Sequence, residues 1–217
     1  MKKTVVLVSA LICSSNTLAI PSDFDFSGQF FADNDVALFD FTLESDQTVT
    51  LFTSSWGDDL GDGDGWVAGA GFDPILTIWD GSGVLVDEQD NGDIEGTTAS
   101  NGVDYTYGVW DVFLDVALPA GDYFATLTQY DNFSIDTLLG NGFQRDDSPT
   151  FTFDDGFGSD PFFNGVWSAD DPRSGDWAFH ILNADAASQI PVGATWALFG
   201  IGLLGLFSTR RDVRENI

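Results

Sequence analysis

The stretch GFDPILTIWDGSGVLVDEQD, residues 71–90, has the pattern that decides the fold. Apolar side chains fill most positions on both faces of its first half, as expected of a buried β-strand. The sequence Asp-Gly-Ser-Gly at residues 80–83 is typical of a tight turn, because glycine adopts positive φ and aspartate accepts hydrogen bonds from its own turn. Residues 84–86 then return beside the first strand. The stretch therefore predicts a central β-hairpin that other strands must cover.

Segments on both sides of this hairpin alternate apolar and polar residues, as strands with one buried face do. The predicted strands lie at residues 24–31, 36–43, 48–53, 107–118, 123–130 and 177–182, with a weak strand at 150–153. Residues 87–104 and most of 131–176 are rich in aspartate and glycine and are expected to be loops. Short antiparallel strands separated by turns predict an all-β fold, an antiparallel β-sandwich that is jelly-roll-like.

The charge of the chain is strongly one-sided. Its 217 residues include 35 Asp and Glu against seven Lys and Arg, and residues 20–207 carry 33 acids and two bases, a net charge of −31. Nucleic acid is excluded as a partner, because phosphate binding needs basic contacts. All but four of the acids are aspartate, the short acid that binds Ca²⁺ in loops. The alternative is an acidic surface adapted to a salty medium.

One acidic loop is a candidate metal site. Residues 57–65 interleave glycines with four aspartates, namely Asp58, Asp59, Asp62 and Asp64. Glycine lets the backbone turn tightly enough for several carboxylates to reach one cation. The spacing does not fit an EF-hand, so we predict irregular coordination, with Ca²⁺ as the cofactor. The alternative is a flexible acidic loop.

Both ends of the chain have the pattern of export signals. Residues 1–19 combine two lysines with an apolar run and small residues before Ala19, which predicts a secretory signal peptide. We expect a β-sandwich domain at residues 20–183, a linker at 184–189 and an anchor or sorting segment at 190–217. The 18 uncharged residues 190–207 would form a transmembrane helix of about 27 Å, close to the ~30 Å core of a bilayer.

The tail resembles the PEP-CTERM motif, which exosortase recognises. It has the tetrad IPVG at residues 190–193, an apolar run GIGLLGLF and a terminal arginine pair. The tetrad departs from the usual Val-Pro-Glu-Pro at its last two positions. The resemblance implies sorting through Ile190, Pro191, Arg210 and Arg211, with exosortase and the membrane as partners during sorting. It also implies an association with extracellular polysaccharide and biofilm matrix. The alternative is a plain membrane anchor.

Five segments across about residues 24–182 resemble a family of exported bacterial domains of unassigned activity. They are NDVALFDFTL, VTLFTSS, GFDPILTIWD, LPAGDYFATLTQYDNF and GDWAFHILN, in this order. Those domains carry a central GFDP motif and are similar in build to the pre-peptidase C-terminal domain. The resemblance implies a jelly-roll-like sandwich without a known reaction.

The sequence contains little catalytic chemistry. His180 is the single histidine, it lies within a predicted strand, and there is no G-x-S-x-G motif. We therefore predict no catalytic residues and no enzyme activity. Tryptophans in the glycine-rich loops could instead stack on sugar rings; they are Trp56, Trp66 and Trp167.

These observations predict a non-catalytic, exported protein of the cell envelope, outer surface or extracellular matrix, sorted by exosortase. Its C-terminal membrane anchor would be transient or permanent. It would be associated with exopolysaccharide or biofilm. The alternative is a Ca²⁺-assisted carbohydrate-binding module.

Overall fold

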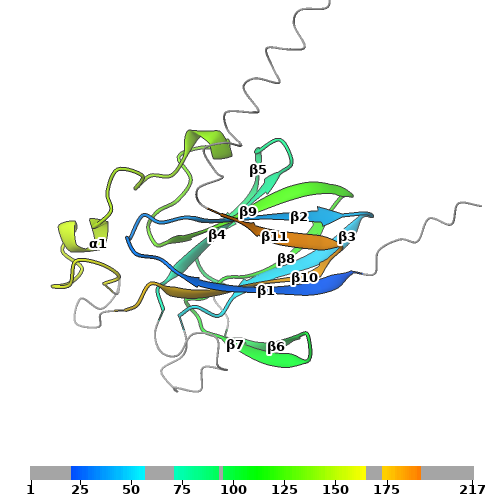
Figure 1. Cartoon of the computed structure of the whole chain (residues 1–217), viewed down its shortest axis with the longest axis horizontal. Coiled ribbons are helices and arrows are strands. Elements are labelled where there is room, and N and C mark those ends of the chain that lie inside the picture. Colours follow the sequence, from blue (N-terminus) through cyan, green and yellow to red (C-terminus); the bar gives the residue numbers. More distant parts are fainter. Residues whose placement is uncertain (1–20, 57–70, 93–94, 165–172, 192–217) are drawn as a thin grey trace, which may run out of the picture.

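The structure is a computed structural model that describes residues 21–56, 71–92, 95–164 and 173–191. This part of the chain consists almost entirely of antiparallel β-strands and the segments between them (Figure 1), so the all-β prediction is confirmed. The predicted signal peptide and nearly all of the predicted sorting tail lie outside it. None of the helices in the described ranges is long and apolar enough to cross a membrane.

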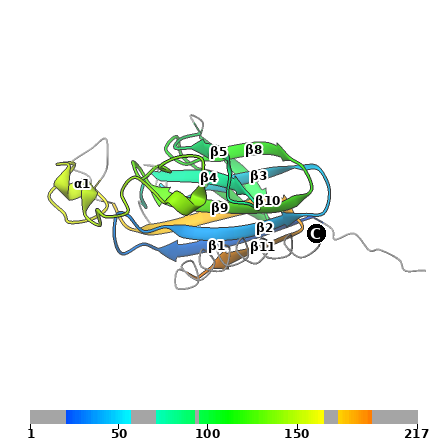
Figure 2. The same ribbon diagram turned by 90° about the horizontal axis from the view of Figure 1, so that it is seen from above.

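Two sheets pack face to face and form what we call the two-sheet body. The first sheet contains, in spatial order, β1 (Ser22–Gln29), β10 (Asp176–Ala184), β3 (Gln47–Thr53) and β8 (Phe113–Leu118). The second contains β11 (Ala186–Ile190), β2 (Ala37–Leu43), β9 (Gly121–Gln129), β4 (Pro74–Asp80) and β5 (Leu85–Gln89). A short helix, α1 (Phe151–Asp154), lies beyond the strand ends at one end of the body (Figures 1 and 2).

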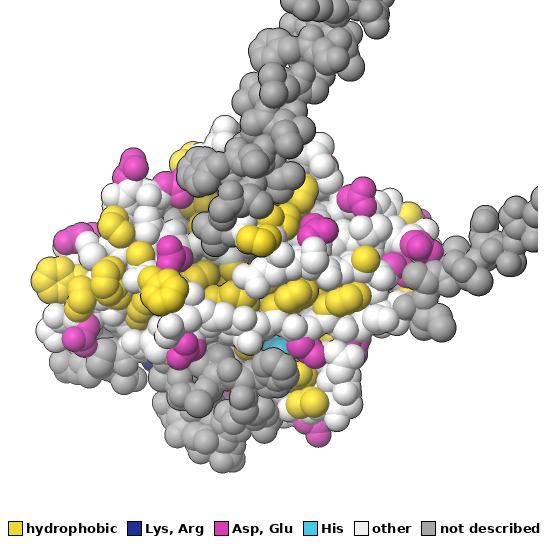
Figure 3. All heavy atoms as spheres, in the orientation of Figure 1, with side chains coloured by type: hydrophobic (Ala, Val, Ile, Leu, Met, Phe, Trp, Pro, Cys, Tyr) yellow, Lys and Arg dark blue, Asp and Glu magenta, His cyan; other side chains and the backbone are white. Residues whose placement is uncertain are grey.

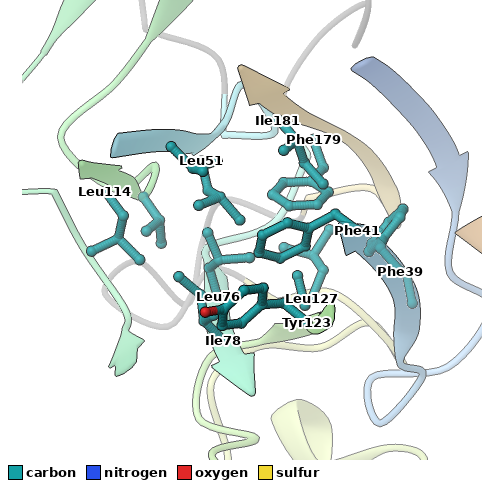
Figure 4. Close-up of a cluster of buried hydrophobic side chains, with 14 of the residues drawn as sticks. Phe39, Phe41, Leu51, Leu76, Ile78, Leu114, Tyr123, Leu127, Phe179 and Ile181 are labelled. Carbon is teal, nitrogen blue, oxygen red and sulfur yellow. The ribbon is translucent and has the colours of Figure 1, made fainter. Parts of the chain in front are cut away.

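The core lies between the sheets because alternate residues of each strand point toward the opposite sheet. Phe39 of β2 and Phe179 of β10 meet across it with their ring centroids 4.7 Å apart (Figure 4). Leu51 and Leu114 enter from the first sheet, and Leu127 enters from the second. Apolar side chains also form a row across the face shown in Figure 3.

The predicted central hairpin is confirmed. Strand β4 pairs with β5 on one side and with β9 on the other. Trp79 points away from the core, packs against Leu139, and donates a hydrogen bond from Nε1 to Thr126 Oγ1 (3.1 Å). The turn forms as expected, because Asp80 Oδ1 accepts the backbone N–H of Ser82 (2.9 Å). Both faces of β4 are thus buried.

Two strands occupy a region predicted to be loop. Strands β6 (Gly96–Ser100) and β7 (Val103–Tyr107) form a separate hairpin, drawn below the body in Figure 1. Its Tyr105 and Tyr107 pack on Phe52 of β3, which covers part of the outer face of the first sheet. The strand predicted at residues 107–118 is correspondingly shorter, because residues 108–112 form the connection that brings the chain back to β8.

The predicted linker is also partly wrong, since residues 186–190 form β11. These residues pair with β2, and Ile190 is the register partner of Leu38. Small side chains such as Ala187 fit against the core without showing an alternating pattern in the sequence. The weak strand predicted at residues 150–153 is helix α1 instead, because Asp33 accepts hydrogen bonds from both the backbone N–H and the hydroxyl of Thr152 and holds this turn.

Candidate functional site

Asp73 is the third residue of the GFDP motif and lies immediately before β4. Its side chain is 2% exposed, and neither carboxylate oxygen has a hydrogen-bond partner among the described residues. Its backbone carbonyl accepts the N–H of Tyr130 (2.8 Å), which holds Asp73 beside the end of β9. Buried acceptors without donors are rare in native proteins and destabilise them. Asp73 is therefore the first residue of a candidate site.

Two neutral oxygens lie at the same end of the second sheet. The side-chain carbonyl oxygens of Gln129 and Asn91 are also buried, with no partner in the described part of the chain. Gln129 is the register partner of Pro74, and Asn91 follows β5, the other neighbour of β4. The start of β4 and the ends of both adjacent strands thus meet there.

The surroundings of Asp73 are unfavourable for a charged carboxylate. Burial raises the pKa of Asp73, and the charges of Asp90 and Asp111 raise it further, to about 8, although Arg173 acts in the opposite direction. The carboxyl of Asp73 therefore favours its protonated, neutral form at neutral pH. Within the described ranges, no three His, Cys, Asp or Glu side chains come together as a metal site.

Asp111 shows what a structural aspartate looks like in this protein. It is fully buried, and its carboxylate accepts hydrogen bonds from four groups: the backbone N–H of Ser55 (2.7 Å), Trp56 (3.1 Å) and Gly108 (3.0 Å), and the hydroxyl of Thr53 (2.8 Å). Burial raises the pKa of Asp111, and these hydrogen bonds oppose the rise. The arrangement joins the end of β3 to the turn before β8.

Trp56 is the one predicted sugar-binding residue that the structure describes. The guanidinium of Arg173 lies 3.3 Å from its ring centroid, and Arg173 Nη1 donates to the Trp56 carbonyl (3.0 Å). The ring of Trp110 lies 5.8 Å away at an angle of 50°. One face of Trp56 is therefore occupied by a cation, and a sugar could use only the other face.

A second polar arrangement joins Asp25, His180 and Ser54. Asp25 Oδ1 lies 2.8 Å from His180 Nδ1, and Ser54 Oγ lies 3.0 Å from His180 Nε2. Because the carboxylate can only accept, Nδ1–H donates to Asp25 and Nε2 accepts the serine hydroxyl. These are the contacts of a Ser-His-Asp triad. The sequence predicted a structural histidine and indicated neither partner.

The surroundings of His180 favour a structural role. Its ring is fully buried, with the ring centroids of Phe52 and Tyr105 at 4.4 and 4.1 Å. An acyl-transfer site also needs N–H groups free to bind a developing oxyanion. The amides of Ser54, Ser55 and Trp56, the described amides nearest to the hydroxyl in sequence, all donate within the fold. The three side chains therefore join β1, β10 and the end of β3.

The remaining predicted site residues lie outside the described residues. They are Asp58, Asp59, Asp62, Asp64, Trp66, Trp167, Arg210 and Arg211. Ile190 and Pro191 are described, at the end of β11 and directly after it. Sequence reasoning did not assign a role to Asp73, although the GFDP motif marked its position. No signal in the sequence indicated that its carboxylate is buried without hydrogen-bond donors from the described residues.

Comparison of the chain with protein-family models and with curated proteins finds no match.

Proposed function

We propose that this chain is a non-catalytic, exported protein of the cell surface or extracellular matrix, with a jelly-roll-like β-sandwich sorted by exosortase. The observation that carries the proposal is the position of β11. This strand ends at Ile190, and Pro191 of the proposed tetrad follows at once. Processing just after the tetrad would remove the tail without removing any residue of the two-sheet body.

The charge of the described surface supports an extracellular role. The described ranges contain two arginines, and both already contact other residues. Arg145 forms ion pairs with Asp131 (2.7 Å) and Asp155 (3.0 Å), while Arg173 lies over Trp56. Acidic side chains are scattered over the face shown in Figure 3. Such a surface repels nucleic acid and favours a medium that supplies screening cations.

The sorting proposal predicts a defined C-terminus. Protein exported by a host that contains exosortase should lack the residues after about Gly193, and intact-mass analysis would show this loss. A Pro191→Ala variant should keep its tail, yet melt at the wild-type temperature because Pro191 lies after the last strand. Detection of Arg211 in the mature wild-type protein would refute sorting and leave a plain anchor.

A Ca²⁺-assisted carbohydrate-binding module is the second candidate, favoured by the adjacent half-buried rings of Trp56 and Trp110. Retention on extracellular polysaccharide should be lost in Trp56→Ala. It should persist in Trp56→Phe, which keeps an aromatic face for stacking on a sugar. Equal retention of all three proteins would exclude Trp56 from sugar binding.

A further inference from the structure

We propose that the chain cuts itself at the Asp73–Pro74 peptide bond of the GFDP motif, with the carboxyl of Asp73 as the attacking group. This reaction goes beyond the proposed function, which gives the motif no role. It is a single self-processing event at one bond and involves no second substrate. It is therefore compatible with the proposed non-catalytic role.

Aspartate followed by proline is a chemically distinct pair. The side-chain carboxyl of aspartate can attack its own carbonyl carbon, because this attack closes a five-membered ring. Proline contributes a tertiary amide whose nitrogen carries no hydrogen. This nitrogen accepts a proton more readily than that of an ordinary peptide bond and leaves as a secondary amine. The sequence contains three Asp-Pro bonds, which follow residues 73, 160 and 171.

The carboxyl of Asp73 is available for this attack. Its side chain is 2% exposed, and neither oxygen has a hydrogen-bond partner among the described residues. Burial raises the pKa of Asp73, and the charges of Asp90 and Asp111 raise it further, to about 8, against the effect of Arg173. At neutral pH the carboxyl therefore carries the proton that the departing proline nitrogen needs.

The carbonyl group under attack already has a hydrogen-bond donor. The backbone N–H of Tyr130 donates to the Asp73 carbonyl oxygen at 2.8 Å. Attack makes this oxygen an oxyanion, and a fixed N–H group at this distance stabilises such a charge. The pairing of β4 with β9 holds both groups, because Pro74 is the register partner of Gln129, the residue before Tyr130. The fold thus positions the donor before the reaction begins.

The reaction balances without a cofactor. One side-chain oxygen of Asp73 bonds to the carbonyl carbon, the carboxyl proton passes to the Pro74 nitrogen, and the C–N bond breaks. The products are a cyclic anhydride at residue 73 and a secondary amine at residue 74. One water molecule then adds to the anhydride and breaks one of its C–O bonds, which leaves two carboxyl groups on residue 73. The net reaction is hydrolysis of one peptide bond.

The strand order allows the cut protein to stay assembled. The piece before the cut contains β1, β2 and β3, and the piece after it contains β4 to β11. In the described sheets, each strand of the first piece pairs only with strands of the second: β1 with β10, β2 with β9 and β11, and β3 with β8 and β10. The two pieces should therefore separate only when the protein is unfolded.

The test is intact-mass analysis of the exported chain under denaturing conditions, after incubation for days at pH 7 with protease inhibitors. Wild type should yield one piece that ends at Asp73 and one that begins at Pro74, while native size-exclusion chromatography shows a single species. The Asp160–Pro161 bond is the internal control, because Asp160 is exposed and water solvates its carboxylate. It should break at least about tenfold more slowly. A bond after Asp73 that breaks no faster than this control would overturn the proposal.

The pH dependence gives a second test on the wild-type protein. The cutting rate should fall as the pH rises above about 8, where the carboxyl of Asp73 loses its proton in the presence of Asp90, Asp111 and Arg173. Burial and nearby carboxylates raise the pKa of Tyr130, so this neighbour stays neutral over the same range. A rate that stays constant or increases from pH 7 to pH 9 would overturn the proposed step.

Two variants separate self-cleavage from cutting by a contaminating protease. Asp73→Asn removes the acidic proton, and Pro74→Ala keeps the carboxyl but makes the leaving nitrogen that of an ordinary amide. Both variants should be cut at least about tenfold more slowly than wild type. Cutting of either variant at the wild-type rate would overturn the proposal. The internal control and the pH dependence need no variant, so they decide the question if a variant does not fold.

Discussion

Replacing Asp25 by asparagine should destabilise the protein by about 2 kcal/mol at neutral pH, and this loss should disappear in acid. Burial by itself would raise the pKa of Asp25. The hydrogen bond from His180 and those from Asn101 and Ser100 outweigh burial and lower the pKa from 3.8 to about 2. At about 1.4 kcal/mol per pKa unit, this difference corresponds to at most about 2.5 kcal/mol of stability, and we expect about 2 kcal/mol because solvent screens a carboxylate that is still 11% exposed.

The sign of the pH dependence follows from the lowered pKa. The folded state favours the charged carboxylate, so the stabilisation is fully present above the unfolded pKa of 3.8. It decreases as the pH falls from about 4 toward 2, because the folded protein then also binds the proton. Asparagine resembles the protonated acid and does not titrate. The difference in unfolding free energy between wild type and Asp25→Asn should therefore shrink toward zero near pH 2.

Urea unfolding followed by tryptophan fluorescence at several pH values would measure this difference. The protein should be dilute, because its isoelectric point is about 4.1. Asp23→Asn is the matched control, since Asp23 lies on the same strand and contacts Asn101, whereas Asp25 is the acid that contacts His180. Asp23→Asn should lower the free energy of unfolding by less than about 0.5 kcal/mol, as surface substitutions usually do. A free-energy difference for Asp25→Asn that stays constant from pH 7 to pH 2 would refute the reasoning.

Two further predictions concern packing and buried acceptors. Gly71→Ala should cost about 3 kcal/mol or more in urea unfolding, because its methyl group would collide with the backbone carbonyls of Ser55 and Asp176. In Gly121→Ala the nearest atom to the added methyl group would lie 3.7 Å away, so the free energy of unfolding should change little. Equal losses of stability in the two variants would contradict the steric explanation. Asp33→Asn should lower the free energy of unfolding by about 1–3 kcal/mol. The amide NH₂ of asparagine would then face an N–H group that now donates to the carboxylate, that of Thr152 or of Phe163. Limited proteolysis should then cut residues 150–164 faster than in wild type; an unchanged rate would exclude Asp33 as their anchor.

The local patterns of the sequence predicted the hairpin of β4 and β5 well. Its signals are an apolar run and a turn in which Asp80 accepts hydrogen bonds from the backbone N–H groups of Ser82 and Val84. Both signals depend only on neighbouring residues. The hairpin of β6 and β7 carried a comparable signal. Asn101 and Gly102 have φ values of 49° and 78°, as a two-residue hairpin turn requires. Its first strand, GTTAS, lacked the apolar alternation on which the prediction relied, whereas Val103, Tyr105 and Tyr107 do alternate with polar residues in the second strand.

Other features depend on contacts between distant parts of the chain. Strand β11 forms because β2 offers an edge more than 140 residues earlier in the sequence, as in the pairing of Ser188 with Asp40. The contacts of His180 likewise come from β1 and from the end of β3. The residues next to 186–190 do not indicate the pairing with β2, and those next to His180 do not indicate its contacts with Asp25 and Ser54. These contacts became visible only once the strand order was known.

The buried aspartates show why Asp73 differs from the rest of this acidic chain. Three aspartates are buried in the described ranges, and two of them have a full set of donors. Asp111 accepts hydrogen bonds from four groups, and Asp33 accepts three from two residues. The fold can therefore supply donors to a buried carboxylate, yet the described residues supply none to Asp73. Burial without compensating hydrogen bonds is the main reason why the pKa of Asp73 rises to about 8.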